Sequence, residues 1–502
     1  MERLSGLDAS FLYLETPSQV MSVAAILQID PSTIPGGYSF EKLRAEMARR
    51  VKGLPIFRRK LADSVTNIDH PVWVEDEDFD IERHVVRIAI PSPGRVHEVA
   101  QMCSHLVGQQ LDRKKPLWDL WVMEGMENDR VALLLRMHHA SVDGATVADI
   151  LGQLATVSPD PPELDPEQVA ITAGEAPRVE LAVGGALNYF LQRPIAAVKL
   201  IPKSLPVPVE WIKRVRSGDG MPAPFLAPRT RFNAPLTPRR SIALTQLPMA
   251  EVKRIKDHFG VKVNDVVLAM TGGALRDYLA EREELPDDPL VGLVPVSVRG
   301  AEEKDLVVAG TNKVTGMFTR LPTTVADPIE RLRVAGIYAN QAKAHHSDVD
   351  PNMLRAFAEF APGNTLGAFM RLYADRRLSA LHPPIFNTVI SNVAGPPYDM
   401  YLLGGRVESV YPLAPIFHGL GLNITVFSAG GVLNIGLLTC ADITPDIWDL
   451  CDGFEKQLDE LTAAVDAEVA AAEVAEAMDA QVRADAEAAV IDEITVLHVE
   501  GK

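Results

Sequence analysis

The sequence predicts an α/β protein of two units, because strand-like and helix-like segments alternate twice along the chain. The first alternation occupies residues 1–157, and a second begins at residue 240. A chain of 502 residues, 47% hydrophobic and 23% charged, is long enough for two folded domains. We therefore expect an N-terminal subdomain at 1–157, a linker and crossover at 158–239, a C-terminal subdomain at 240–465 and an acidic, Ala-rich tail at 466–502.

The elements of the first unit follow from the spacing of their apolar residues. Leu43, Met47 and Val51 recur at helical spacing, and the helix must end before Gly53 and Pro55. Unbroken apolar or aromatic runs are typical of strands. The predicted order is strand 21–29, helix 40–51, strand 71–74, helix 96–111, strand 116–124, strand 131–137 and helix 145–154.

The second unit repeats the pattern and ends in a hairpin. Ala429-Gly430-Gly431 between two apolar runs is a strong hairpin signal, and Asn264 is placed to cap a helix that continues to about residue 280. The predicted elements are strand 241–245, helix 249–259, the helix after Asn264, strand 290–298, helix 325–343, strand 385–390, strands 420–428 and 432–440, and helix 448–465. Residues 466–502 hold ten acids and two bases, which indicates a solvated helix without chemistry of its own.

Charge and cysteine content exclude several classes of protein. A net charge of -18 argues against nucleic-acid binding, which needs a basic face. Three scattered cysteines indicate neither a disulfide framework nor a zinc site, and they favour a reducing compartment. The first residues lack the order of a signal peptide, and no apolar stretch reaches the roughly 18 residues of a spanning helix. Any membrane contact should therefore be peripheral.

One strongly basic segment stands out between residues 188 and 216. It contains six Lys and Arg residues against one acid, interleaved with large apolar side chains. This composition fits a segment that lies on a membrane surface. It fits equally well a crossover that packs one domain on the other with a solvated basic face.

Paired histidines, His138 and His139, follow the apolar run 130–136 and precede Asp143 and Gly144. Such a His-His-x-x-x-Asp-Gly sequence arises by chance on the order of once per thousand chains of this composition. Adjacent side chains on a strand point to opposite faces, so the pair is a poor metal site. Ser141 lacks the Gly-x-Ser-x-Gly context of a nucleophile. The pattern favours one histidine as a general base facing a cavity, with its neighbour packed behind it.

The segment 138–144 resembles the active-site motif of CoA-dependent acyltransferases, which include chloramphenicol acetyltransferases, carnitine acyltransferases and peptide-synthetase condensation domains. Further motifs are similar to those of the bacterial wax ester synthase/diacylglycerol acyltransferase family. They are residues 3–17, Pro116-Leu117-Trp118 with Glu124-Gly125, Asn264-Asp265, residues 294–299, and Asn387 with residues 391–396. The resemblance extends to about Leu461. Ala394 departs from it, because many members have Pro there.

The resemblance implies two chloramphenicol-acetyltransferase-like subdomains, each a mixed sheet with flanking helices, which are joined by a crossover and enclose a tunnel. It implies an O-acyltransferase that makes triacylglycerol from diacylglycerol and long-chain acyl-CoA, with wax esters from fatty alcohols as a second product. Acyl-CoA would be a co-substrate, and no cofactor or metal is expected. The expected location is cytoplasmic, on a membrane or lipid-droplet surface through residues 188–216.

Two alternatives to this activity remain open at this point. A condensation-type domain would use carrier-bound thioesters, although no adenylation or carrier module is evident in the sequence. A weakly active or inactive paralogue would act as a lipid-surface protein, and the intact motif at 138–144 counts against that reading.

The resemblance also assigns roles to individual residues. His139 is the expected general base, supported by His138, Asp143 and Gly144, and Asp143 is expected to pair with Arg299. Candidate donors to the oxyanion are Asn264, Ser391 and Asn392, with the alternative that Asn264 only caps its helix and the other two shape a turn. Pro116, Leu117 and Trp118 are assigned to substrate binding, with packing in the core as the alternative.

Overall fold

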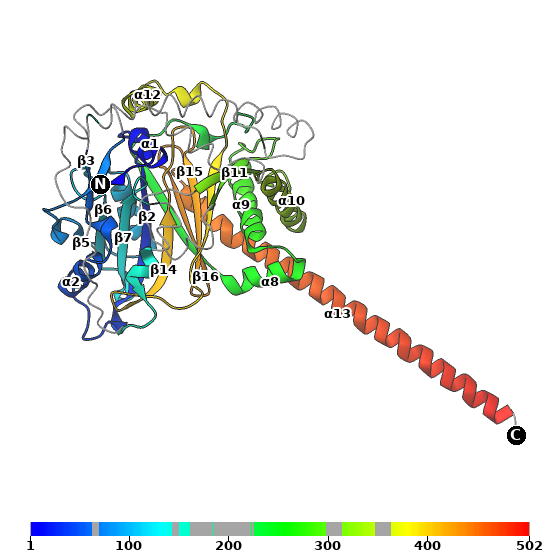
Figure 1. Cartoon of the computed structure of the whole chain (residues 1–502). Helices are drawn as coiled ribbons and strands as arrows, with labels where there is room; N and C mark the ends of the chain where they lie inside the picture. The colour runs from blue at the N-terminus through cyan, green and yellow to red at the C-terminus, as the bar shows by residue number, and fades with distance from the viewer. Residues whose placement is uncertain are drawn as a thin grey trace.

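The protein is a two-part α/β structure with one long helix projecting from it (Figure 1). The computed structural model describes residues 2–62, 70–142, 150–160, 183, 222, 225–297, 314–346 and 363–500. Two sheets lie side by side, one formed mainly by the first half of the chain and one by the second. The predicted fold class, two sheet-containing halves with flanking helices, is confirmed.

The sheet of the N-terminal half has the strand order β5-β6-β7-β2-β14-β13-β8. All neighbours are antiparallel except β5 and β6. Its strands are β2 (Ser22–Asp30), β5 (Val85–Ala89), β6 (Trp118–Glu124), β7 (Val131–His138), β8 (Ala155–Thr156), β13 (Tyr401–Leu402) and β14 (Gly405–Leu413). A small separate sheet contains β1 (Glu2–Arg3), β3 (Arg59–Ala62) and β4 (Val72–Glu75).

The sheet of the C-terminal half has the order β11-β10-β12-β15-β16-β9. The β10–β12 and β12–β15 pairs are parallel and the others antiparallel, so the sheet is mixed as expected. Its strands are β9 (Arg240–Pro248), β10 (Val291–Ser297), β11 (Val314–Arg320), β12 (Thr388–Ala394), β15 (Leu422–Ala429) and β16 (Val432–Cys440). The β15–β16 hairpin turns at Gly430 and Gly431, whose φ angles of 55° and 82° explain why glycine occupies both positions.

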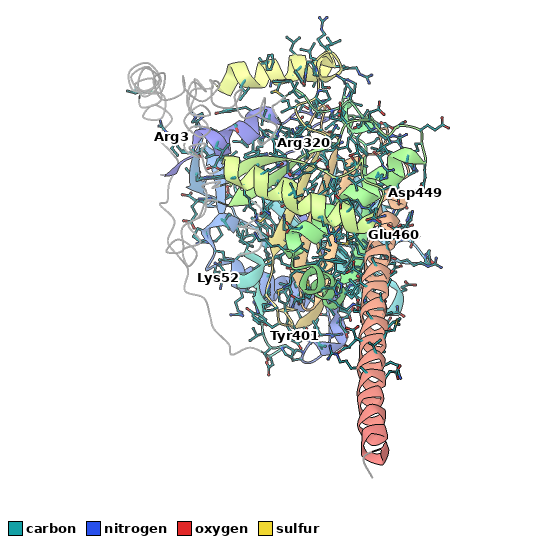
Figure 2. All side chains as sticks on the ribbon, turned by 90° about the vertical axis from the view of Figure 1, so that its right-hand side faces the viewer. Arg3, Lys52, Arg320, Tyr401, Asp449 and Glu460 are labelled. Carbon is teal, nitrogen blue, oxygen red and sulfur yellow. The ribbon has the colours of Figure 1, made fainter. Side chains whose placement is uncertain are left out.

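Helices cover the outer faces of the sheets and the junction between them. The helices are α1 (Gly6–Leu14), α2 (Phe40–Val51), α3 (Val96–Val107), α8 (Met249–Phe259), α9 (Val263–Ala280), α10 (Pro328–His346), α12 (Gly363–Asp375) and α13 (Ile447–Glu500). The side chains of α9, α10 and the first part of α13 form one apolar core with the C-terminal sheet. Figure 2 shows this helix layer from outside, with α13 running away from it. Helix α3 packs against both halves.

Two predicted helices match the structure closely, and one predicted cap is wrong. Helices 40–51 and 249–259 have the predicted bounds, because a clear apolar stripe faces the core in each. Asn264 does not cap α9, which begins at Val263, one residue before it. Instead the carboxylate of Asp265 reaches back and accepts a hydrogen bond of 3.0 Å from the backbone N–H of Lys262. An acidic group in the first turn also suits the positive end of the helix.

Strand β14 comes from the later part of the chain but belongs to the sheet of the N-terminal half. Although residues 401–413 fall within the segment assigned to the C-terminal subdomain, β13 and β14 belong to the N-terminal sheet, where β14 pairs with β2. At Gly436, on β16 of the other sheet, an added Cβ would collide with the backbone carbonyl of Pro412 on β14. The sheets therefore meet at a point where only glycine fits.

The tail lies within the described residues, whereas the basic part of the crossover does not. Helix α13 continues the packed helix to Glu500, and its side chains from 466 to 483 are exposed, as a solvated helix requires. In the described part of the chain, none of the helices combines the length and apolar character that a membrane span requires. The basic segment 188–216 lies outside the described residues.

Replacing Gly436 with Ala should destabilise the contact between the sheets. We expect the free energy of unfolding to fall by about 1–3 kcal/mol, the usual effect of overpacking, because the obstructing atom is backbone and cannot rotate away. Urea unfolding followed by circular dichroism measures the loss. Gly152→Ala is the matched control, since nothing lies within 4 Å of its Cβ position. Equal stability of the two variants would contradict the close approach.

Candidate active site

His138 is the last residue of β7 and is fully buried. It lies opposite Ser22 of β2 in the antiparallel ladder. The backbone N–H of Ala140 donates a hydrogen bond of 3.0 Å to its Nδ1. Because that nitrogen accepts, a neutral ring carries its proton on Nε2, which lies 3.6 Å from Oε1 of Glu15. The hydrogen bond from Ala140 thus selects one tautomer of the neutral ring, and the Glu15 carboxylate faces its protonated nitrogen.

His139 lies one residue beyond the strand and is only partly buried. Its backbone N–H donates to the carbonyl of Met21 at 2.8 Å. Its ring stacks on Phe11, with ring centroids 4.0 Å apart and planes inclined by 16°. Of the two histidines, His139 is therefore the one with access to solvent or substrate, whereas His138 is enclosed by the protein.

A buried ion pair joins β7, the strand that leads to the histidines, to its neighbour β6. The guanidinium of Arg136 on β7 bonds to Asp119 on β6 at 2.6 and 2.9 Å. The same guanidinium donates to the carbonyls of Leu106 and Gln109 at the end of α3. Because these acceptors satisfy its donors, Arg136 links β7 to β6 and to α3 at a position two residues before His138.

Glu15 is a site residue that the sequence reasoning did not single out. Its carboxylate accepts from the guanidinium of Arg113 at 2.8 Å and from the backbone N–H of Met21 at 3.2 Å, and it faces His138. Burial alone would raise the pKa of Glu15, but the contacts with His138 and Arg113 outweigh it and lower the pKa to about 2. A permanent negative charge therefore stands beside the proton-bearing nitrogen of His138.

Phe11, Glu15 and Met21 all come from α1 and the turn that follows it. Ser5 caps α1 by accepting from the backbone N–H of Asp8. The three residues are spaced along one short stretch that contacts both histidines. In the sequence, residues 3–17 carry the family resemblance but give no sign of the separate roles of Phe11 and Glu15.

Residues of the C-terminal half also contact the turn that follows α1. His418 donates its backbone N–H to Oε1 of Gln19 at 2.7 Å, and its Nε2 lies 3.1 Å from Oγ of Ser18. Arg240 donates to the carbonyl of Ser18 at 2.6 Å. Burial, with a smaller contribution from Arg240, lowers the pKa of His418 to about 4, so the ring is neutral at pH 7. The turn that holds the catalytic candidates is thus fixed from both halves.

A small apolar cavity lies between the halves and receives one of the candidate oxyanion donors. It has a volume of about 40 Å³. Its lining comes from β2, β12, β14, β15 and the helical segment at 150–154, and includes Val23, Leu151, Ser391, Val410, Thr425 and Phe427. Along β12, alternate residues face opposite sides, so Ser391 faces the cavity whereas Asn392 shares the side of Ile390, which packs in the core of the C-terminal half.

The other candidates are placed less directly. Asn264 is partly buried in the first turn of α9, and its role as an oxyanion donor stays a prediction. Asp143, Gly144 and Arg299 lie outside the described residues, so their expected roles and the Asp143–Arg299 ion pair also stay predictions.

The structure places Pro116, Leu117 and Trp118 in the interior. Trp118 is fully buried, stacks on His84 with centroids 4.5 Å apart, and donates from Nε1 to the carbonyl of Phe57 at 2.8 Å. Leu117 packs in a cluster with Ala140, next to the histidine pair. These contacts match the core alternative, and substrate binding by this segment stays a prediction.

Comparison with known structures first defines the fold class. The trichothecene 15-O-acetyltransferase of Fusarium sporotrichioides has a TM-score of 0.55 at 12% identity, over 91% of this chain and 94% of that one. The first condensation domain of the calcium-dependent antibiotic synthetase has a TM-score of 0.53 at 14% identity, over 92% and 96%. At such identities the likeness concerns the fold alone, an α/β arrangement of two sheet-containing halves.

Closer similarity identifies the family. The wax ester synthase/diacylglycerol acyltransferase catalytic-domain model matches residues 4–267, and the model of the family's C-terminal domain matches residues 310–462. A Mycobacterium tuberculosis protein designated a diacylglycerol O-acyltransferase is 44% identical over 462 residues, 92% of this chain and 90% of that protein. The wax ester synthase/diacylglycerol acyltransferase of Marinobacter aquaeolei VT8 has a TM-score of 0.67 at 26% identity, covering 93% of this chain and 100% of that one. The chain belongs to the wax ester synthase/diacylglycerol acyltransferase family and is an enzyme.

Replacing Glu15 with Gln should remove a pH-dependent part of the stability. The pKa of Glu15 is about 2 in the folded protein against an ordinary 4.5, so its ionised form contributes stability above pH 4.5 that is lost as the pH falls toward 2. The difference corresponds to about 3 kcal/mol at pH 7. Urea unfolding at pH 7 and pH 3 should show a large difference between wild type and Glu15→Gln at pH 7 and a smaller one at pH 3. A difference that is the same at both pH values would contradict the assignment.

Proposed function

We propose that this enzyme transfers a long-chain acyl group from acyl-CoA to the free hydroxyl of diacylglycerol, giving triacylglycerol and CoA. Fatty alcohols would be accepted as well, giving wax esters. The observation that carries the proposal is the pair of histidines, one enclosed and oriented, the other partly exposed and stacked on Phe11. The names of the relatives supply the substrate class, since they are designated diacylglycerol O-acyltransferases.

In the proposed reaction His139 is the general base. A neutral imidazole, with an ordinary pKa of about 6.5, takes the proton of the acceptor hydroxyl while the oxygen attacks the thioester carbonyl. The tetrahedral intermediate then collapses, the carbon–sulfur bond breaks, and the imidazolium returns the proton to the CoA thiolate. The acyl group passes directly to the acceptor, so neither a covalent acyl-enzyme nor a metal or cofactor takes part.

The surroundings of His139 suit this role because a general base must be held at a fixed position and angle. The stacked ring of Phe11 limits the tilt of the imidazole, and the bond to the Met21 carbonyl fixes its backbone. His138, oriented by Ala140 and Glu15, fills the space behind. We assign Phe11, Glu15 and His138 to positioning rather than to proton transfer.

The oxyanion of the intermediate requires hydrogen-bond donors, and loss of one donor typically lowers the rate by about 10²- to 10³-fold. We favour Ser391 over Asn392, because only Ser391 faces the cavity between the halves. We further propose that this cavity belongs to a tunnel that acyl-CoA and the acceptor enter from opposite ends. The acceptor is insoluble in water, so we also propose that the enzyme works in the cytoplasm on a membrane or lipid-droplet surface, with residues 188–216 as one contact.

Replacing His139 with Ala should abolish turnover while leaving the fold intact. With oleoyl-CoA and dioleoylglycerol, release of CoA measured with a thiol reagent should fall by about 10²- to 10⁴-fold, the usual contribution of a general base. His105→Ala, on the exposed side of α3, is the matched control and should keep full activity.

A folded His139→Ala variant with wild-type turnover would show that the general base is another group. A wild-type protein that folds and releases no CoA with diacylglycerol, fatty alcohols or other alcohols would instead favour a lipid-surface protein without useful turnover.

A further inference from the structure

Helix α12 presents apolar side chains to solvent on a surface where a solvated helix would have polar ones. Gly367 is buried and Met370 is partly buried, whereas Phe369 and Leu372, one turn apart, are 52% and 50% exposed. The outward face of a surface helix is normally polar or charged. Large exposed side chains that gather in one place usually mark an interaction surface.

Contacts between rings connect this face to two neighbouring loops. The ring of Tyr373 lies 6.0 Å from that of Phe369, and its hydroxyl lies 2.6 Å from Nε2 of His382. The ring of His382 lies 5.9 Å from that of Phe225. The exposed apolar residues along this path are Phe225 (50% exposed), Leu226 (66%), Phe369, Leu372 and Leu381 (78%), which together we name the α12 patch.

The charges around the α12 patch are mainly positive. Arg371, Arg376 and Arg377 are exposed on or just after α12, and Arg229 bonds to the carbonyl of His382 beside them. The one carboxylate between 363 and 382 is that of Asp375. In a protein of net charge -18, this local excess of arginine is unusual. It complements a negatively charged partner.

The α12 patch also lies next to the active site. Helix α12 packs on α1 at the top of the molecule (Figure 1), where Gly367 approaches the carbonyl of Tyr13. Helix α1 carries Phe11, which stacks on His139. Only one helix therefore separates the exposed apolar side chains from the proposed general base.

We propose that the α12 patch is the surface by which the enzyme docks on a lipid layer bearing anionic headgroups. The inference rests on the proposed function, because an enzyme whose acceptor is dissolved in lipid needs such a contact beside its active site. The aromatic and aliphatic side chains enter the headgroup boundary, and the arginines lie at the level of the phosphates. Each basic side chain near an anionic surface strengthens binding by about fivefold.

Vesicle flotation tests the proposal directly. The full-length protein is mixed with phosphatidylcholine vesicles that contain phosphatidylglycerol, and the fraction that floats is measured. The triple variant Phe369→Gln, Leu372→Gln, Leu381→Gln should bind at least about tenfold more weakly, because the removed side chains supply the apolar contact. The matched control is Val474→Gln, Met478→Gln, Val482→Gln on α13, at positions 60%, 65% and 66% exposed, and it should float like wild type.

A variant without the three arginines separates the electrostatic part of the contact from the apolar part. Arg371→Gln, Arg376→Gln, Arg377→Gln should weaken binding to anionic vesicles by about tenfold or more and leave binding to pure phosphatidylcholine unchanged. An equal loss on both kinds of vesicle, or no loss on either, would contradict a role for anionic headgroups.

Turnover distinguishes failure of docking from failure of the proposed function. The apolar triple variant should keep wild-type turnover on dihexanoylglycerol dissolved in water and lose about tenfold on dioleoylglycerol in vesicles. If wild type itself turns over neither acceptor, the proposed function fails, and flotation still decides whether the α12 patch docks.

Two results would overturn the proposal. One is flotation of the apolar triple variant equal to that of wild type, with folding of both verified by thermal denaturation. The other is a change in oligomeric state without a change in flotation, which would assign the α12 patch to contact with a second copy of the chain.

Discussion

The pairing of β14 with β2 is the interaction on which the rest of the structure depends. The ladder from Arg406 opposite Asp30 to Leu413 opposite Ala24 inserts a late segment of the chain into the middle of the N-terminal sheet. On its other edge β2 pairs with β7, whose last residue is His138. Since β14 also packs against β15 and β16, with Gly436 directly on Pro412, one strand sets the distance between the sheets and the cavity between them.

The turn after α1 is the second point where both halves converge. From one side it holds the histidines through Phe11, Glu15 and Met21. From the other side, His418 and Arg240 of the C-terminal half hold the turn itself. A general base must hold its accepting nitrogen at one position. Contacts that restrict its motion before the substrate binds reduce the entropy that must be lost during the reaction. The arrangement also explains why neither half would form the site alone.

The α12 patch, the proposed lipid contact, lies close to His139, the proposed general base. Direct contacts link α12 to α1 and α1 to His139, whereas α13 leaves the body on a different side (Figure 1). An acceptor arriving from a lipid layer at α12 would therefore enter near the proposed general base. In the proposed docking mode, the long acidic helix would point away from the lipid layer, which would keep its negative charge clear of anionic headgroups.

The sequence by itself determined much of the local structure and singled out one motif for a catalytic role. Periodicity placed helices 40–51 and 249–259, two glycines placed the β15–β16 turn, and the histidine pair marked the candidate site. The predicted cap of α9 was wrong, because the carboxylate of Asp265, and not the side chain of Asn264, accepts the hydrogen bond from the backbone N–H of Lys262. Only the tertiary structure placed β14 in the first sheet, Glu15 beside His138, and His418 on the turn of the other half. Those contacts join residues up to 400 positions apart, and neither spacing nor composition encodes which distant segments come together when apolar surface is buried.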